Sequence, residues 1–205
     1  MAFDALASKE GIEKTKKHLR DNGFLPEEVA SGAEALERIK TLIPAGASVF
    51  NGSSTTLNQI GYIEYLKSGQ HPWTNHNEMI LGESDKAKQS LLRKQLTISD
   101  FYLGSVHAAT ENGELLIASN TGSQLPSIAF NSKNIIFVVS TKKIVRTLPE
   151  AFERIDTHVV PLEDERMMAA SNAHTLHSKT LVLHKENPMM GRKVHVLLVP
   201  EDLGF

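Results

Sequence analysis

The stretch that decides the fold runs from Asp100 to Ser123 and reads DFYLGSVHAATENGELLIASNTGS. Two apolar runs of strand-like composition flank the dipeptide Asn112-Gly113, which is the commonest two-residue connection of a β-hairpin. The same segment holds Asp100, a histidine, a second acid at the turn and a glycine-serine loop. In an α/β fold, polar groups at strand ends gather at one edge of the sheet, where ligands bind. We therefore expect the functional site in this segment.

Helix caps and apolar spacing divide the rest of the chain into short elements. Ser8 and the Ser31/Glu34 capping box begin two helices, and Thr147 with Pro149 begins a later one. The helices predicted in this way span residues 8–21, 31–41, 55–67, 84–96, 124–130, 147–155 and 163–173.

The predicted strands are short and mostly apolar, and the segment 24–26 reads as a break. They span residues 47–50, 78–81, 106–110, 114–119, 134–139, 159–160, 179–184 and 194–199. The last two are expected to pair as a hairpin. Strands that alternate with helices form a mainly parallel sheet, and the hairpins make it mixed. The predicted fold class is α/β, with a mixed, mainly parallel sheet flanked by helices on both sides, in a single domain.

Composition argues against several classes of function. The charge is nearly balanced, with 22 Lys+Arg against 24 Asp+Glu, whereas a nucleic-acid binder normally carries a basic stripe. The sequence has no cysteine and so offers no thiolate for an iron–sulfur cluster or a nucleophile. The longest aliphatic runs are too short to cross a bilayer, and the start lacks the pattern of a secretory signal. We expect a cytoplasmic protein with no membrane or nucleic-acid partner, and a homo-oligomer is left open.

The histidines raise the question of a metal site. His174 and His177 lie three residues apart, and His71 and His76 lie five apart. The sequence contains no His-Glu-x-x-His motif, and no spacing supplies a third ligand. We therefore expect scattered surface histidines and no metal site.

Two hydroxyl-rich loops that follow predicted strands are candidates for anion binding. In the first, VFNGSSTTL, a glycine lets the backbone approach a ligand, and the hydroxyls and amides that follow can hold a phosphate, a carboxylate or part of CoA. The second, SNTGSQLP, repeats this arrangement. The alternative for the first loop is a polar turn that caps a helix. The ligand-binding candidates in the two loops are Asn51, Gly52, Ser53, Ser54, Thr55, Thr56, Asn120, Thr121, Gly122 and Ser123.

Three titratable residues are candidates for catalysis. Glu111 lies at the hairpin tip with Asn112 and Gly113, which would contact the ligand, and its carboxylate could act as general base or nucleophile. His107, inside an apolar strand, and Asp100, at a strand entrance, would assist it. The alternatives are a turn residue for Glu111, a buried neutral histidine for His107 and a turn-closing acid for Asp100.

Four linked blocks of the sequence point to a known family. The blocks TTLNQIG, AATENGELLIASNTGS, NIIFVVSTKKIVRTLPEAF and GRKVHVLLV follow one another across residues 30–200, and together they resemble the LUD-domain family of lactate-utilisation proteins. The resemblance implies the fold of ribose-5-phosphate isomerases, glucosamine-6-phosphate deaminases and CoA transferases. It also implies one domain over residues 1–205, with a helical extension at 1–28. In those relatives the loop after the first strand holds the ligand's phosphate or CoA part, and NGSSTT stands at that place here.

The resemblance leaves three functions open. The first is a protein that binds a small anionic metabolite and acts in or beside the oxidation of lactate to pyruvate. It would need a separate iron–sulfur subunit, because this sequence has no cysteine. The second is a stand-alone CoA transferase or sugar-phosphate isomerase, with a CoA thioester or a sugar phosphate as ligand. One class of CoA transferase carries its nucleophilic glutamate in a Glu-Asn-Gly sequence similar to that at Glu111. The third is a non-catalytic assembly subunit.

Overall fold

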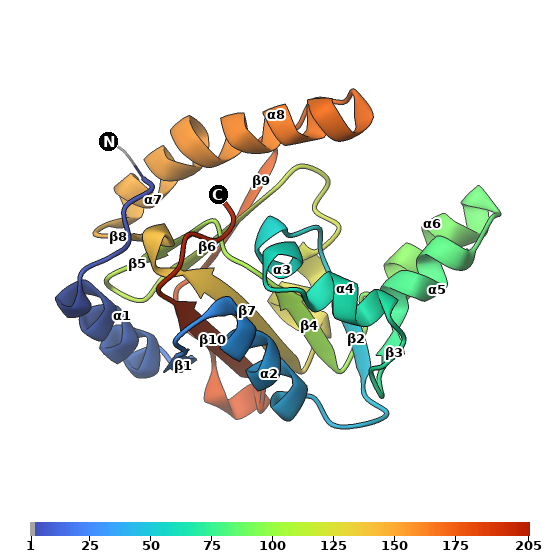
Figure 1. Cartoon of the computed structure of the whole chain (residues 1–205), viewed down its shortest axis with the longest axis horizontal. Helices are drawn as coiled ribbons and strands as arrows, with labels where there is room; N and C mark the ends of the chain where they lie inside the picture. Colours follow the sequence, from blue (N-terminus) through green and yellow to red (C-terminus); the bar gives the residue numbers. More distant parts are fainter. Residues whose placement is uncertain (1–2) are drawn as a thin grey trace.

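Two β-sheets organise the part of the chain that the computed structural model describes, residues 3–205 (Figure 1). The larger sheet is parallel throughout, and its strand order is β1 (Leu25–Glu28), β10 (Lys193–Val199), β7 (Asn134–Ser140), β4 (Phe101–Gly104), β2 (Ser48–Asn51) and β3 (Thr74–Asn75). The smaller sheet is mixed, and its order is β8 (Ile144–Val145), β5 (Ala108–Thr110), β6 (Leu115–Ser119) and β9 (Lys179–Leu183). The predicted α/β class with a mainly parallel, helix-flanked sheet is confirmed. The antiparallel strands were expected within the same sheet, but they belong to the smaller sheet.

Both faces of the larger sheet are buried, as the apolar run of β7 requires. Ile135, Phe137 and Val139 of β7 point to one face, whereas Ile136 and Val138 point to the other. The second face is covered by α2 (Gly32–Leu42), α3 (Thr55–Gln59) and α4 (Tyr62–Lys67). The first face is covered by the smaller sheet together with α1 (Lys9–Asp21), α5 (His76–Gly82) and the π-helical turn η1 (Ser127–Asn131).

One continuous helix covers the outer face of the smaller sheet. It comprises α7 (Leu148–Arg154), the π-helical turn η3 (Ile155–Val159) and α8 (Val160–Ser171). Ala151 and Ile155 of this helix pack on Leu116 of β6. The predicted strand at 159–160 is therefore wrong. The β-branched pair favours a strand locally, but the chain stays helical, and the wider π turn lies just before Pro161, whose ring nitrogen cannot donate a helical hydrogen bond.

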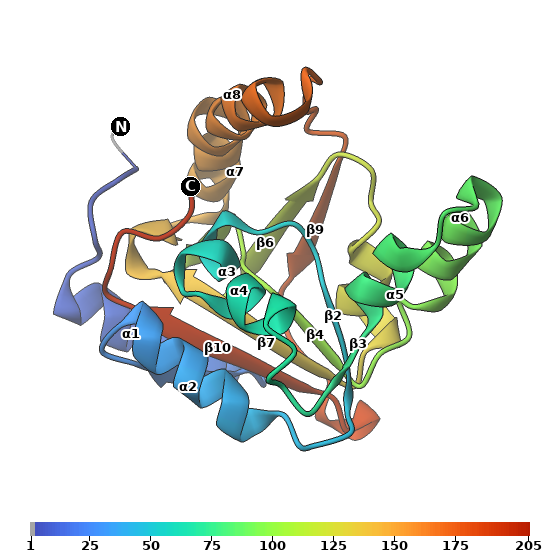
Figure 2. The same ribbon diagram turned by 45° about the vertical axis from the view of Figure 1, so that its right-hand side comes forward.

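Three further predictions near the middle of the chain need correction. The helix expected over 55–67 is broken at Gly61, which has a φ of 80° and separates α3 from α4. The strand expected over 78–81 is helix α5, because the Asn75 side chain accepts hydrogen bonds from two backbone amides and caps it. Helix α6 (Lys86–Gln95) is capped by Asp85, so it begins two residues after the predicted start at residue 84, and its Leu91 is exposed. Helix α6, in which no residue is buried, projects from the body of the protein (Figure 2).

The hairpin predicted at the end of the sequence is also wrong. Strand β9 pairs antiparallel with β6 in the smaller sheet, whereas β10 lies between β1 and β7 in the larger one, and the 3-10 turn η4 (Pro188–Met190) lies between them in the chain. The reason is burial: Val194, Val196 and Leu198 lie in one apolar core, and Leu197 and Val199 lie in the other. A strand that is apolar on both faces belongs at the centre of a parallel sheet.

The segment 24–26, read as a break, leads into the edge strand β1. Pro26 is tolerated there because an edge strand has one side without ladder hydrogen bonds. The preceding helix α1 buries Ile12 and Leu19 in the same core as β7. Of residues 3–28, expected as a helical extension, α1 packs on the larger sheet and β1 is an edge strand of that sheet.

Candidate functional site

A cavity of about 250 Å³ opens where the carboxyl ends of the parallel strands meet. One side of the cavity is formed by four segments that follow strands of the larger sheet: the loops after β2 and β4, the turn after β7 and the segment after β10. The other side is formed by the end of β6 and the start of α8. This is the edge at which open α/β sheets bind ligands. The polar side chains on the cavity wall include Ser53, Thr55, Thr56, Ser105, His107 and Lys143.

The loop after β2 approaches the cavity closely because Gly52 has no side chain. A Cβ on Gly52 would lie 2.8 Å from the hydroxyl oxygen of Tyr102. Ser54 accepts a hydrogen bond of 3.2 Å from the amide of Leu57, so its hydroxyl caps α3, as the plain alternative predicts. Ser53 and Thr55 line the cavity beside it.

Lys143 is the charged group at the centre of this wall. It ends the 3-10 turn η2 (Thr141–Lys143), which follows the central strand β7. The side chain is buried, and its Nζ donates hydrogen bonds of 3.1 Å to the hydroxyls of Thr56 and Ser105. Within residues 3–205, no carboxylate lies within 4.0 Å of this nitrogen. Burial and the nearby Arg154 and Lys142 lower the pKa of Lys143 to about 7.

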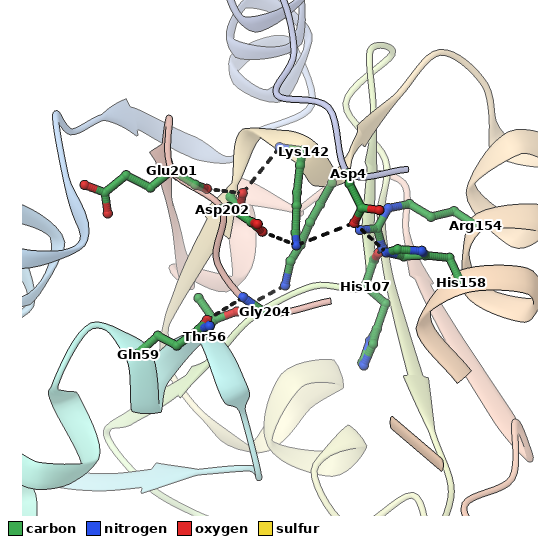
Figure 3. A network of polar contacts seen from close by, with 12 residues as sticks. Asp4, Thr56, Gln59, His107, Lys142, Arg154, His158, Glu201, Asp202 and Gly204 are labelled. Carbon is green, nitrogen blue, oxygen red and sulfur yellow. Dashed lines mark hydrogen bonds and ion pairs between the residues drawn. The ribbon is translucent and has the colours of Figure 1, made fainter. Parts of the chain in front are cut away.

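Lys142 and Arg154 are two further cations near Lys143, and Figure 3 shows that their partners differ. Lys142 forms an ion pair with Asp202, and its Nζ lies 4.0 Å from an oxygen of Asp4. Arg154 is fully buried and donates one hydrogen bond to the backbone carbonyl of His107. Burial lowers the pKa of Arg154 to about 10. The resulting positive field acts on Lys143 and on any anion in the cavity.

His107 lines the cavity as a neutral ring. Its Nδ1 accepts a hydrogen bond of 3.0 Å from the amide of Ala118, and an amide can only donate. The proton of the neutral ring is therefore on Nε2. Burial, together with the charges of Lys143 and Arg154, lowers the pKa of His107 to about 3. This geometry matches the alternative of a buried neutral histidine and leaves one N–H donor on the ring.

The second hydroxyl-rich loop reaches the same cavity, as expected. Asn120, Thr121 and Ser123 line it, whereas Gly122 does not and packs on Lys179. Ser119 holds the loop, because its hydroxyl accepts a hydrogen bond of 2.9 Å from the amide of Gly122. In the first loop, Asn51 lies outside the cavity wall.

The segment between α8 and β9 covers one side of the cavity and carries the pair His174 and His177. His177 lines the cavity and is bonded to Asp156, and His174 is bonded to Asp164 at 2.9 Å. These contacts join the segment between α8 and β9 to the helix formed by η3 and α8. Among the described residues, no group of three or more His, Cys, Asp and Glu side chains is placed to hold a metal ion.

Glu111 is not brought to the cavity. Its carboxylate forms an ion pair of 2.7 Å with Lys14 of α1, and its carbonyl is 2.6 Å from Nδ1 of His18. Asn112 and Gly113 accompany it, and their carbonyls accept hydrogen bonds from the Asn22 side chain; none of these residues lines the cavity. The expected meeting of the hairpin tip with the two loops does not occur in this structure.

Asp100 also lies away from the cavity, at the amino end of β4. Its carboxylate accepts hydrogen bonds of 2.8 Å from the amide and 2.7 Å from the hydroxyl of Ser48. These bonds lower the pKa of Asp100. The side chain closes the entrance to two neighbouring strands, which is the structural alternative for this residue.

Lys143 is the residue that sequence reasoning missed. The sequence does contain a pattern that could have indicated this residue. The segment Ser140-Thr141-Lys142-Lys143 stands at the end of a buried strand, as the two hydroxyl-rich loops do. Two adjacent lysines after a strand are usually exposed, so the pattern alone does not reveal burial.

The fold and the site define an α/β protein with a polar, lysine-containing cavity at the carboxyl edge of a parallel sheet. The chain belongs to the LUD domain family, which matches residues 12–199. A crystal structure of a DUF162 family protein from Deinococcus radiodurans, determined at 1.70 Å resolution, is similar, with a TM-score of 0.57, 15% identity and coverage of 95% of this chain and 99% of that chain. This likeness shows the fold alone. No curated protein matches. Over residues 3–205, every helix is too short or too polar for a membrane crossing.

Proposed function

We propose that the cavity binds a small organic anion and that the protein acts in the oxidation of lactate to pyruvate beside a separate iron–sulfur protein. The proposal rests mainly on the surroundings of Lys143. Its buried ammonium group has hydroxyl partners and, within residues 3–205, no carboxylate within 4.0 Å. Burying an ammonium group costs several kcal/mol unless an anion or hydrogen bonds compensate it. A bound carboxylate would supply the missing charge.

The size of the cavity favours a metabolite of a few carbon atoms. Its volume of about 250 Å³ is below the usual range for drug-sized ligands and corresponds to roughly eight water molecules. Ser53, Thr55 and Thr121 add hydroxyls that suit a carboxylate or a hydroxy acid. Family membership supports lactate or pyruvate as the first ligands to test.

The alternatives differ in what they require of the site. A CoA transferase that acts through Glu111 needs this carboxylate in the cavity, whereas it is paired with Lys14 outside. A sugar phosphate would use the same loops as a carboxylate and is the direct competitor. An assembly subunit would need no small ligand.

Calorimetric titration separates these alternatives. Lactate, pyruvate, ribose 5-phosphate and acetyl-CoA are titrated into the wild-type protein and into Lys143→Met and Lys14→Met, the second being an exposed lysine as control. We expect a carboxylate to bind, with affinity reduced about tenfold or more in Lys143→Met, since one lost charge contact is worth at least about 1.4 kcal/mol. Lys14→Met keeps the affinity. Absence of carboxylate binding, or unchanged affinity in Lys143→Met, would contradict the proposal.

A further inference from the structure

Lys143 is placed as a nucleophile as well as a cation. Its Nζ lies on the cavity wall between two hydroxyls, those of Thr56 and Ser105, at 3.1 Å from each. A hydroxyl can accept a hydrogen bond from an ammonium group or donate one to a neutral amine. The two hydroxyls can therefore bond to either protonation state of this lysine.

The charged and titratable groups around Lys143 favour the neutral amine. Lys142 and Arg154 are cationic neighbours, and His107 is neutral. The acids and bases at the rim are engaged elsewhere: Glu163 binds Arg166 with two hydrogen bonds, and His177 binds Asp156. With a pKa of about 7, roughly half of the Lys143 side chains are neutral at pH 7, on the order of a thousandfold more than for an exposed lysine.

We propose that Lys143 forms an imine with the keto group of a small 2-oxo carboxylate held in the cavity. The inference rests on the proposed binding of an organic anion, and it specifies that this anion is a 2-oxo acid. A 2-oxo acid carries a carboxylate beside its carbonyl, so the hydroxyls of Ser53 and Thr55 can hold the carboxylate while the carbonyl carbon faces the amine. A lysine that is buried or lies beside another cationic group is the usual setting of imine-forming lysines.

The step balances without any oxidant or reductant. The lone pair of the neutral Nζ forms a bond to the carbonyl carbon, the carbonyl oxygen takes up a proton, and Nζ loses one, which gives a carbinolamine. The hydroxyl group then leaves as water after taking up a second proton, and the nitrogen loses its remaining hydrogen as the C=N bond forms. Ser105 and Thr56, bonded to Nζ, are placed to pass these protons. The net reaction is amine plus ketone to imine plus water.

The neighbouring lysine provides a matched comparison. Lys142 precedes Lys143 in the same turn and is also buried, but its ammonium group is paired with Asp202. Lys142 is absent from the cavity wall. The inference therefore assigns the reaction to one of two adjacent lysines, which peptide fragmentation can distinguish.

Reductive trapping tests the inference. The full-length protein is incubated with pyruvate and sodium borohydride, whose hydride reduces an imine to a stable secondary amine, and labelled peptides are identified by mass spectrometry. We expect a pyruvate-derived adduct on Lys143 in at least about tenfold higher yield than on any other lysine, given its larger neutral fraction. Lactate, which has no carbonyl, should give no adduct and should compete. Lys143→Arg should abolish the label, and Lys142→Arg should keep it.

The outcomes separate this inference from the proposed function. Calorimetric binding of pyruvate without an adduct on Lys143 would overturn the imine and leave anion binding intact. Binding of lactate without binding of pyruvate would overturn the imine alone, and absence of binding by either carboxylate would overturn both. An adduct spread over exposed lysines would also overturn the imine. Because Lys143→Arg can fail to fold, its circular dichroism is recorded, and protection of the wild-type protein by lactate serves as the test that needs no variant.

Discussion

The Nζ of Lys143 lies 3.1 Å from the hydroxyl oxygen of Thr56, and this contact joins the turn after β7 to the helix that follows β2. The two elements are far apart in sequence but adjacent at the carboxyl edge of the sheet. Gly204 packs over the contact with a φ of 67°, so the segment after β10 also depends on it. The position of one buried lysine is thus set by three separate parts of the chain.

Gly204→Ala is expected to disturb this arrangement. The added Cβ would lie 2.7 Å from Nζ of Lys143, and a φ of 67° is unfavourable for alanine by about 1–2 kcal/mol. We predict a loss of stability of at least this size, measured by urea unfolding, together with weaker binding of the carboxylate in calorimetry.

Gly46→Ala is the matched control for this substitution. Gly46 has a similar φ of 81°, but no atom lies within 4 Å of the position that an alanine Cβ would take there. The variant should lose about 1–2 kcal/mol through the backbone alone and bind the carboxylate normally. Equal ligand affinity in both variants would show that Gly204 has no special relation to the cavity.

Lys143→Met is expected to stabilise the protein below neutral pH. The pKa of Lys143 is lowered to about 7 in the folded state, so the unfolded chain binds more protons between pH 7 and about 10.5. The wild-type protein should therefore gain stability as pH rises through this window. The variant has no buried ammonium group and so avoids the cost of burying its charge. It should be more stable than the wild-type protein by about 1–3 kcal/mol at pH 6, with a smaller difference at pH 9. Urea unfolding of both proteins at the two pH values measures the sign of this difference in unfolding free energy.

His107 is expected to destabilise the fold in acid. Burial lowers its pKa from 6.5 to about 3, so the unfolded chain takes up a proton between these values and the folded protein does not. Stability should fall as pH decreases from 6.5 toward 3, by at most about 1.4 kcal/mol per pH unit from this group. His107→Asn retains an acceptor for the Ala118 amide and should flatten the slope. Nitrogen NMR should find the proton on Nε2, and a proton on Nδ1 would disprove the assigned hydrogen bond.

Glu111→Gln is expected to leave the cavity unchanged. The carboxylate lies outside it and is paired with the half-exposed Lys14, so the substitution should cost less than about 1 kcal/mol of stability. Carboxylate affinity in calorimetry should equal that of the wild-type protein. Loss of binding, or labelling of Glu111 by acetyl-CoA and hydroxylamine in the wild-type protein, would instead support the transferase alternative.

Local sequence signals predicted much of the fold because they act over a few residues. Ser8, Ser31 and Thr147 cap helices as expected. The hairpin turn forms at the predicted place, but Glu111 and Asn112 are its central residues and Gly113 follows them at a φ of 84°, so the loop has three residues instead of two. The two hydroxyl-rich loops reach one cavity although the first follows β2 of the larger sheet and the second follows β6 of the smaller sheet, so the packing of one sheet on the other brings them together.

The errors arose where long-range packing decides the outcome. The pairing partners of β9 and β10 depend on which faces are buried, which a local hairpin pattern does not specify. The direction of the Glu111 turn is set by the smaller sheet, which directs it to Lys14. Lys143 is buried against Gly204 and Thr56, which are distant from it in sequence, and a local pattern does not specify such contacts.

The most direct test of the central claim is a crystal structure of the wild-type protein soaked with pyruvate or lactate. The account predicts density for the carboxylate in the cavity, within hydrogen-bonding distance of Lys143 or of the hydroxyls beside it. Ligand density at the Glu111 turn, or a cavity that holds only water at saturating ligand, would contradict it.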